Sequence, residues 1–195
     1  MIQAIRGTKD LLPDTIALWQ YAEEVFRNIS HSYLYREMRT PIFEKTEVFS
    51  RSIGEQTDIV NKEMYTFEDR SGESITLRPE MTAAIARAVM QNSLMQQSSV
   101  LRYWYFGPFF RYERPQKGRL RQFHQYGAEC ILSPYPESDV EVMLLANDII
   151  KSMGIEKYTL LLNSIGNEAS RDKYREALKD YFFQFTDQIS EDSQK

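Results

Sequence analysis

The spacing of apolar residues along the chain predicts four helices. From Ile16 to Tyr33 apolar side chains recur every three or four residues, as on the buried face of an amphipathic helix. Asp14 is the expected N-cap, and the sequence Arg39-Thr40-Pro41 is expected to end this helix. The other helices are expected to begin at Pro79 and to span 137–153 and 167–185.

Strand and turn signals alternate between these helices. Extended segments are predicted at 41–43, 64–67, 74–77, 103–113, 122–132 and 159–163. The turn Asp69-Arg70-Ser71-Gly72 joins one hairpin, and a basic loop at 114–121 joins a second, longer one, whereas residues 50–62 are expected to be a loop. Hairpins flanked by helices indicate an α+β fold with a largely antiparallel sheet.

The second strand of the longer hairpin has one unusual face. Side chains alternate between the two faces of a strand, so Gln125, Gly127 and Glu129 point the same way as Phe123. The opposite face is apolar enough to pack against helices, and it carries His124, Tyr126, Ala128, Cys130 and Leu132.

The first strand of this hairpin offers a matching face with Phe109, Arg111 and Glu113. If the two faces coincide, they form a concave surface of one arginine, two glutamates and one glutamine. Gly127 would leave room there for a ligand to approach the backbone closely. The alternative is a solvent-facing surface, which would expose Phe109 and Phe123 to water.

Composition and charge narrow the function classes. Apolar residues make up 42% of the chain, charged residues 27%, and the net charge is −4, which argues against a protein that coats nucleic acid. Residues 102–124 nevertheless hold six basic residues and one acid. This local excess fits a bound anion, or a basic turn that is simply solvated. With one cysteine, no apolar signal segment and no membrane-length apolar run, we expect a cytoplasmic protein.

Two further features concern ligands with charge. The chain has no Walker loop and no G-x-G-x-x-G sequence, so phosphates would be held by arginines. Glu80 lies at the predicted start of a helix, where a carboxylate caps the helix or receives a substrate ammonium group. The sequence shows no cluster of metal-ligating side chains.

Four ordered segments resemble one family. The string FFRYERPQKGRLRQFHQYGAE at 109–129 is similar to motif 2 of histidyl-tRNA synthetases, which are class II aminoacyl-tRNA synthetases. IRGTKDLLP at 5–13 resembles the N-terminal signature of that family, and the helix ending at Pro41 resembles motif 1, which builds the family's dimer interface. TLRPEMTA at 76–83 resembles its amino-acid-binding strand–helix junction, and the resemblance extends along the whole chain.

The resemblance implies an ATP site on the hairpin. Arg111 would be the catalytic residue, holding the α-phosphate of ATP and stabilising charge on the α-phosphoryl group during attack. Glu113 would lie by the adenine and the tRNA acceptor end. Arg119 would hold the γ-phosphate, and Phe123 would stack on the adenine. Mg²⁺ is expected on the phosphates.

The resemblance also implies a histidine site beside the ATP site. Glu80, Thr82 and the backbone at Met81 would receive the amino group, although bacterial members commonly have glycine where this chain has Met81. The residues that would line the rest of the site are Gln125, Gly127, Glu129 and Arg111. The implied reaction forms histidyl-adenylate from histidine and ATP and then transfers histidine to tRNA(His).

The chain also departs from the family pattern. The histidine-specific motif, motif 3 and the anticodon-binding domain are absent from residues 1–195. We therefore expect the N-terminal part of a catalytic domain, with a sheet that is incomplete on its C-terminal side. Such a chain would form homodimers through the motif 1 region in its full-length parent, and alone it would be inactive.

Two other functions remain open from the sequence. The family contains a non-catalytic regulatory subunit of ATP phosphoribosyltransferase, which acts in histidine biosynthesis. That subunit does not need the ATP contacts implied for Arg111, Arg119 and Phe123, and all three residues are present here. The third possibility is a stand-alone dimerisation or binding module.

Overall fold

The computed structural model describes residues 2–53, 63–164, 166–186 and 190. The chain divides into two compact units, Met1–Glu156 and Lys157–Lys195, which are considered separately. In the described residues, no helix combines the length and the apolar character needed to span a membrane.

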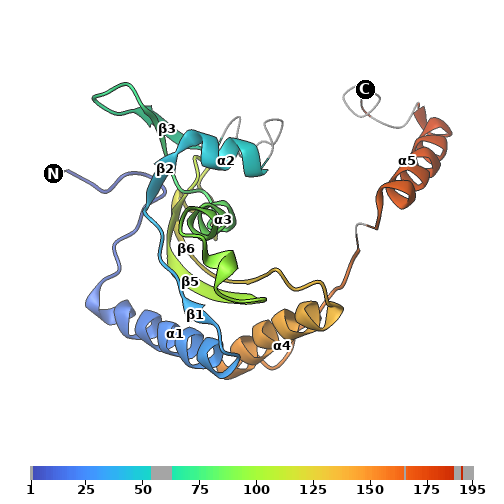
Figure 1. The fold of residues 1–195 in the computed structure, drawn as a ribbon. Helices are drawn as coiled ribbons and strands as arrows, with labels where there is room; N and C mark the ends of the chain where they lie inside the picture. Colours follow the sequence, from blue (N-terminus) through green and yellow to red (C-terminus); the bar gives the residue numbers. More distant parts are fainter. Residues whose placement is uncertain (1, 54–62, 165, 187–189, 191–195) are drawn as a thin grey trace. The chain divides into compact units, whose positions relative to one another are not determined.

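The first unit is built around a three-stranded sheet that contains the predicted long hairpin. Strands β5 (Leu101–Phe110) and β6 (Gln122–Ile131) are antiparallel partners along their full lengths. A short strand, β1 (Arg36–Glu37), pairs in parallel with the other edge of β5, giving the order β1-β5-β6. Figure 1 shows this sheet at the centre of the unit, with helices on both sides.

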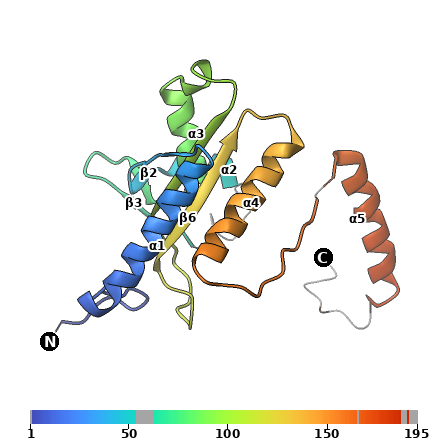
Figure 2. The ribbon, with the colours of Figure 1, turned by 90° about the horizontal axis from the view of Figure 1, so that it is seen from below.

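Two helices cover one face of this sheet. Helices α1 (Pro13–Ser32) and α4 (Pro136–Ser152) lie side by side across β6 (Figure 2). Tyr126 and Cys130 of β6 pack there against a buried cluster that includes Trp104 and Leu145. The predicted packing face of the second hairpin strand is therefore confirmed for Tyr126, Ala128 and Cys130. Leu132 was wrongly included, because β6 ends at Ile131 and Leu132 is 45% exposed.

Helix α3 (Thr82–Gln91) covers part of the opposite face. Ala84, Ile85 and Val89 of this helix are buried against Tyr105 and Phe109 of β5. The unusual polar face of the hairpin is thus not simply open to solvent, because a helix supplies an apolar cover for its aromatic residues.

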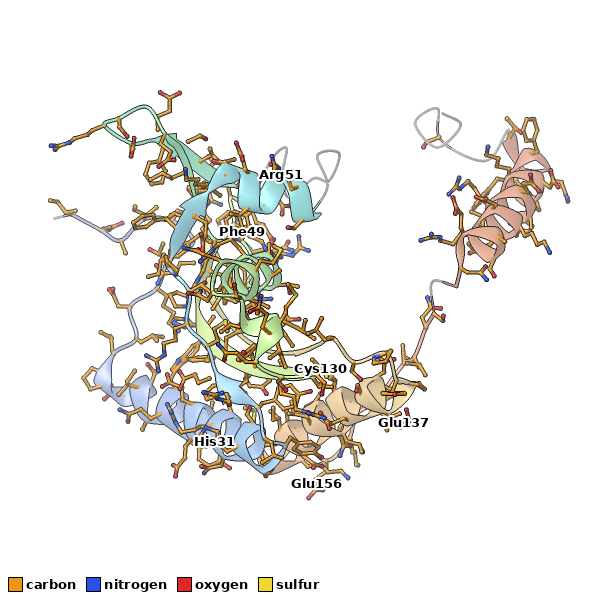
Figure 3. The ribbon with its side chains drawn as sticks, in the orientation of Figure 1. His31, Phe49, Arg51, Cys130, Glu137 and Glu156 are labelled. Atoms are coloured by element: carbon orange, nitrogen blue, oxygen red, sulfur yellow. The ribbon has the colours of Figure 1, made fainter. Side chains whose placement is uncertain are left out.

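A second, smaller sheet carries the chain into α3. It has the order β2-β4-β3 and is antiparallel throughout, and its strands are β2 (Phe43–Lys45), β3 (Tyr65–Glu68) and β4 (Ser74–Leu77). Helix α2 (Thr46–Ile53) follows β2, and its fully buried Phe49 is labelled in Figure 3 where α2 packs on α3. A short 3-10 helix, η2 (Leu94–Gln96), follows α3.

The first predicted helix has different ends from those expected. Pro13 is the first helical residue and Leu12 the N-cap, so the assignment of Asp14 as N-cap was wrong. The helix ends at Ser32 and not at residue 39, because Leu34 adopts a positive φ of 63° and the next residues join the sheet as β1. The turn at Leu34 and the pairing of Arg36 and Glu37 with β5 therefore end the helix before residue 39.

The second predicted helix begins later than expected. Helix α3 starts at Thr82, and Pro79 lies outside it. Backbone hydrogen bonds explain the delay, since the Arg78 N–H donates to the Ile42 carbonyl at 2.9 Å and the Arg78 carbonyl accepts from Phe110 N–H at 3.1 Å. These bonds hold the segment before Pro79 extended between two strands.

Two other predictions change in the structure. Residues 50–53, expected in a loop, belong to α2, and the rest of that predicted loop lies outside the described residues. The strand predicted at 159–163 is absent, and Leu161 is 87% exposed. A strand needs a partner for its backbone groups, and no described strand pairs with this segment.

The last predicted helix is confirmed in the second unit. Helix α5 spans Glu168–Phe183, and the Asn167 side chain caps its N-terminus by accepting a hydrogen bond from Ser170 N–H at 2.9 Å. Three aromatic side chains of α5 are exposed in this unit: Tyr174 by 68%, Phe182 by 43% and Phe183 by 80%.

Candidate active site

The register of β5 and β6 brings the two predicted faces together. Phe109 lies opposite Phe123, and their ring centroids are 6.1 Å apart. The surface that faces α3, called here the ligand face, consists of Tyr103, Tyr105, Gly107, Phe109, Phe123, Gln125, Gly127 and Glu129. Arg111 and Glu113 follow just beyond β5, which ends at Phe110 rather than at residue 113.

An acidic cluster forms where α3 meets the ligand face. The Glu80 carboxylate accepts hydrogen bonds from Thr82 N–H at 2.5 Å and from Ala83 N–H at 3.0 Å, so it caps the helix. The Thr82 hydroxyl donates to Glu129 Oε1 at 2.7 Å. Burial, and to a lesser extent the nearby charge of Glu80, raise the pKa of Glu129, while the Thr82 hydrogen bond opposes them.

This cluster has two carboxylates and no cation. Within the described residues, no ion pair involves Glu80 or Glu129. The structure shows that Glu80 caps the helix. The expected binding of an ammonium group by the same carboxylate is compatible with this cap. Met81 is 1% exposed with its side chain in the core, so its side chain is not available to a ligand.

Side chains fill the space above both glycines of the ligand face. A Cβ atom on Gly127 would lie 2.2 Å from the phenol oxygen of Tyr105. A Cβ atom on Gly107 would lie 2.7 Å from Nη2 of Arg78. The vacancy expected at Gly127 is therefore occupied by the phenol in this structure, and Tyr105 is 7% exposed.

Sequence analysis missed both of these side chains. Arg78 is 4% exposed, and its guanidinium donates from Nε to the Pro108 carbonyl and from Nη1 to the Thr40 carbonyl, each at 3.0 Å. Burial lowers its pKa. The register of the hairpin would have placed Tyr105 opposite Gly127, whereas Arg78 comes from outside the hairpin and had no such signal.

A basic cluster lies at the other end of the ligand face. Nε of Arg111 donates to the Pro79 carbonyl at 2.9 Å, and its guanidinium carbon lies 5.2 Å from the centre of the Phe123 ring. The Glu113 carboxylate lies 4.0 Å from Nη1 of Arg111. Arg119 approaches the same carboxylate at 3.3 Å, although the angle does not make a hydrogen bond.

The loop after β5 carries Arg119, and backbone hydrogen bonds hold both ends of the loop. Arg111 N–H donates to the Arg121 carbonyl at 3.0 Å, and Gln116 and Arg119 form a small antiparallel bridge. Arg121 N–H donates to the Gly7 carbonyl at 2.7 Å, which ties the N-terminal segment to the loop. The Arg119 side chain remains 63% exposed.

Not every basic residue of the 102–124 window joins this cluster. Arg102 makes two hydrogen bonds with Glu141 of α4, at 2.7 and 3.1 Å. This pair lies on the face of the sheet that α1 and α4 cover. The basic window is therefore divided between a structural ion pair and the loop. Among the described residues, no group of three or more His, Cys, Asp or Glu side chains could hold a metal ion.

The ligand face has opposite charges at its two ends. Carboxylates without a cationic partner can hold an ammonium group, and guanidinium groups can hold phosphate oxygens in pairs. Gln125 lies between these two ends, opposite Gly107. The arrangement suits a ligand that carries both charges, or a cationic and an anionic ligand side by side.

Comparison with known sequences places the chain in one family. Residues 7–188 match the family described as Histidyl-tRNA synthetase. The histidine–tRNA ligase of Acaryochloris marina is 53% identical over 99% of this chain, and that of Thermotoga petrophila is 52% identical over 98%. The chain spans 45% and 46% of the lengths of these relatives.

Solved structures give the same result for the fold. The crystal structure of apo Staphylococcus aureus histidyl-tRNA synthetase is 37% identical with a TM-score of 0.77, covering 98% of this chain and 45% of that one. A Bacillus halodurans protein described as an ATP phosphoribosyltransferase regulatory subunit/histidyl-tRNA synthetase is 25% identical with a TM-score of 0.69, over 80% and 39% of the two chains. The α+β fold of class II synthetases is thereby confirmed, and the chain belongs to the histidyl-tRNA synthetase family.

Proposed function

We propose that this chain is the N-terminal part of the catalytic domain of a histidine–tRNA ligase. In the full-length enzyme, histidine would react with ATP to give histidyl-adenylate and pyrophosphate. The enzyme would then transfer histidine to the acceptor end of tRNA(His). The observation that carries this proposal is the ligand face, which has unpaired carboxylates at one end and arginines at the other.

The acidic cluster would receive the amino acid. Glu80 and the Thr82 hydroxyl lie at the start of α3, with the Glu129 carboxylate 2.7 Å from that hydroxyl. An incoming ammonium group would be the cationic partner of these carboxylates. It would offset the desolvation that raises the pKa of Glu129. Gln125 and Glu129 would line the rest of the histidine site, and the buried Met81 side chain would not take part.

The basic cluster would receive ATP. Arg111 would hold the α-phosphate, Arg119 the γ-phosphate, and Phe123 would stack on the adenine. Glu113 pairs with both arginines and partly neutralises their charge, and phosphate oxygens would take over that pairing. Glu113 would then lie near the adenine and the tRNA end. Mg²⁺ would be bound by the phosphates, where it neutralises charge on the leaving pyrophosphate.

The reaction requires positioning more than proton transfer. A carboxylate oxygen of histidine attacks the α-phosphorus, the bond to the bridging oxygen breaks, and pyrophosphate leaves with the electron pair. Negative charge on the α-phosphoryl oxygens is stabilised by Arg111, whose Nε is already fixed on the Pro79 carbonyl. A preorganised cation of this kind lowers the barrier without rearranging during the reaction.

The remaining proposals concern the full-length enzyme. The residues missing from this chain relative to its relatives would supply motif 3 and the anticodon-binding domain, and residues 1–195 would be inactive alone. We also propose a homodimer formed through the motif 1 region and a cytoplasmic location, in keeping with a single cysteine.

The test is ATP–pyrophosphate exchange with the full-length protein that contains this segment. Histidine should support exchange, and the other amino acids should not. A protein that binds neither substrate but stimulates an ATP phosphoribosyltransferase would instead be the regulatory subunit. Calorimetry of the 195-residue chain addresses the third possibility, since micromolar ATP affinity would contradict a half-site and favour a self-sufficient binding module.

A further inference from the structure

The packing of Tyr105 on Gly127 defines part of the candidate amino-acid site. The two residues lie opposite each other in the β5–β6 register. The Cζ and Oη atoms of the phenol would both be 2.2 Å from a Cβ atom on Gly127, and Cε2 would be 2.7 Å from it. The far end of the tyrosine ring thus lies directly on the glycine backbone, between the positions of Gln125 and Glu129.

The tyrosine ring has further neighbours in the buried core. Phe109 packs on it with ring centroids 6.1 Å apart, and α3 contributes Ile85 and Ala84 to the same buried cluster. Only 7% of the residue is exposed. A ring fixed in this way cannot move without displacing either the helix or the neighbouring aromatic residue, so it behaves as a rigid surface.

The charges of the acidic cluster also act on the Tyr105 phenol. Burial and the charges of Glu129 and Glu80 raise the pKa of Tyr105 to about 12, with Thr82 acting in the opposite direction. Tyr105 is therefore neutral at physiological pH. A neutral ring beside two carboxylates provides an apolar surface and adds no charge to the acidic cluster.

We propose that Tyr105 is a specificity-determining residue whose ring, seated on Gly127, forms the floor of the amino-acid site. Gly127 is required because only glycine lets the ring reach this depth. The substrate side chain rests on the ring and ends at the Glu129 carboxylate, so the site accepts a small planar side chain that can donate a hydrogen bond. This inference rests on the proposed function and names the residue that limits the size of the substrate.

The test compares two substrates in the full-length enzyme. Tyr105→Leu shortens the floor side chain, so the site becomes deeper. The ratio of kcat/KM for histidine to kcat/KM for an N-methylated histidine should fall at least about tenfold, the discrimination typical of one methyl-sized group. Tyr105→Phe keeps the ring and should keep that ratio within about threefold. The ratio is independent of the fraction of enzyme that is folded.

A second pair of variants separates a floor from a purely structural residue. Gly127→Ala forces the ring upward, and it should raise the histidine KM about tenfold or more while leaving the ATP KM unchanged. The Tyr105→Leu/Gly127→Ala variant removes the clash and should recover folding, yet it should not regain the wild-type substrate ratio. Tyr126→Leu is the matched control, because Tyr126 packs on the opposite face of the same sheet.

The outcomes separate this inference from the proposed function. If histidine fails to support exchange in the wild-type protein, the proposed function is wrong. If the wild-type protein is active but Tyr105→Leu leaves the substrate ratio unchanged, only the floor role is refuted. The same holds if the histidine and ATP KM values rise in parallel in Gly127→Ala, since that pattern indicates a general structural effect.

Discussion

Replacing Arg111 by alanine tests the charge contact on which the proposed chemistry depends. In the proposed reaction its guanidinium stabilises developing charge on the α-phosphoryl group. Removing one preorganised donor from such a site typically lowers kcat by 10²–10³, or about 2.7–4 kcal/mol. Arg111→Ala should therefore lower the rate of histidine-dependent ATP–pyrophosphate exchange in the full-length enzyme by a factor of about 100 or more.

The cost of the same substitution in stability is smaller. Arg111→Ala removes one hydrogen bond, to the Pro79 carbonyl at 2.9 Å, and one contact with the Phe123 ring at 5.2 Å. It also removes a 4.0 Å ion pair with Glu113, and partly exposed pairs of this kind contribute about 0–1 kcal/mol. A typical hydrogen bond contributes about 1 kcal/mol and a partly exposed cation–π contact about 0.5–1 kcal/mol. The variant should remain folded, because domains usually have about 5–15 kcal/mol of stability.

Two control variants sharpen this measurement. Arg111→Lys keeps the positive charge but cannot bind two oxygens with a planar fork, so its activity should fall between wild type and Arg111→Ala. Arg114→Ala removes an exposed arginine of the neighbouring loop and should change the exchange rate by less than about threefold. Exchange by Arg111→Ala within about threefold of wild type would refute the role assigned to Arg111.

Two other substitutions test the ligand face through stability. Gly107→Ala places a Cβ atom 2.7 Å from Nη2 of the buried Arg78 and should destabilise the full-length protein by about 1–3 kcal/mol, seen as a lower thermal midpoint; an unchanged midpoint would show that Arg78 can move away freely. Glu129→Gln should raise stability at pH 7, because burial raises the pKa of Glu129 and its ionised form destabilises the fold above the ordinary value of 4.5. The gain should vanish as the pH falls below 4.5 and the wild-type carboxyl becomes protonated. A gain that is constant from pH 4 to pH 8 would show that ionisation of Glu129 is not its cause.

Local sequence signals predicted the hairpin correctly and the helix ends poorly. The alternation from Phe123 to Glu129 assigned both faces of β6, because side-chain period in a strand is fixed by backbone geometry. The spacing of apolar residues extended the first helix to residue 39, where the structure has β1. The two residues of β1 are charged and not buried, and they form a strand through backbone pairing with β5, which apolar spacing does not report.

The site residues show the same division. The charges at both ends of the ligand face followed from residue types and alternation on one hairpin. Glu80 and Thr82 reach the face from another element, α3, and their contact with Glu129 depends on how that helix packs on β5 and β6. The position of Arg78 also depends on tertiary packing, because its hydrogen bonds to Thr40 and Pro108 join segments that are distant in sequence.

The sequence by itself determined the α+β class, the hairpin with its two distinct faces, and the local excess of basic residues, because these depend on composition and on the period of a strand. Only the tertiary structure decided what fills the space over the glycines. Gly127 suggested an empty position, and the register together with the packing of α3 places the Tyr105 ring there. The physical reason is that a glycine shows where the backbone can be approached, whereas the approaching group is selected by contacts between residues far apart in the chain.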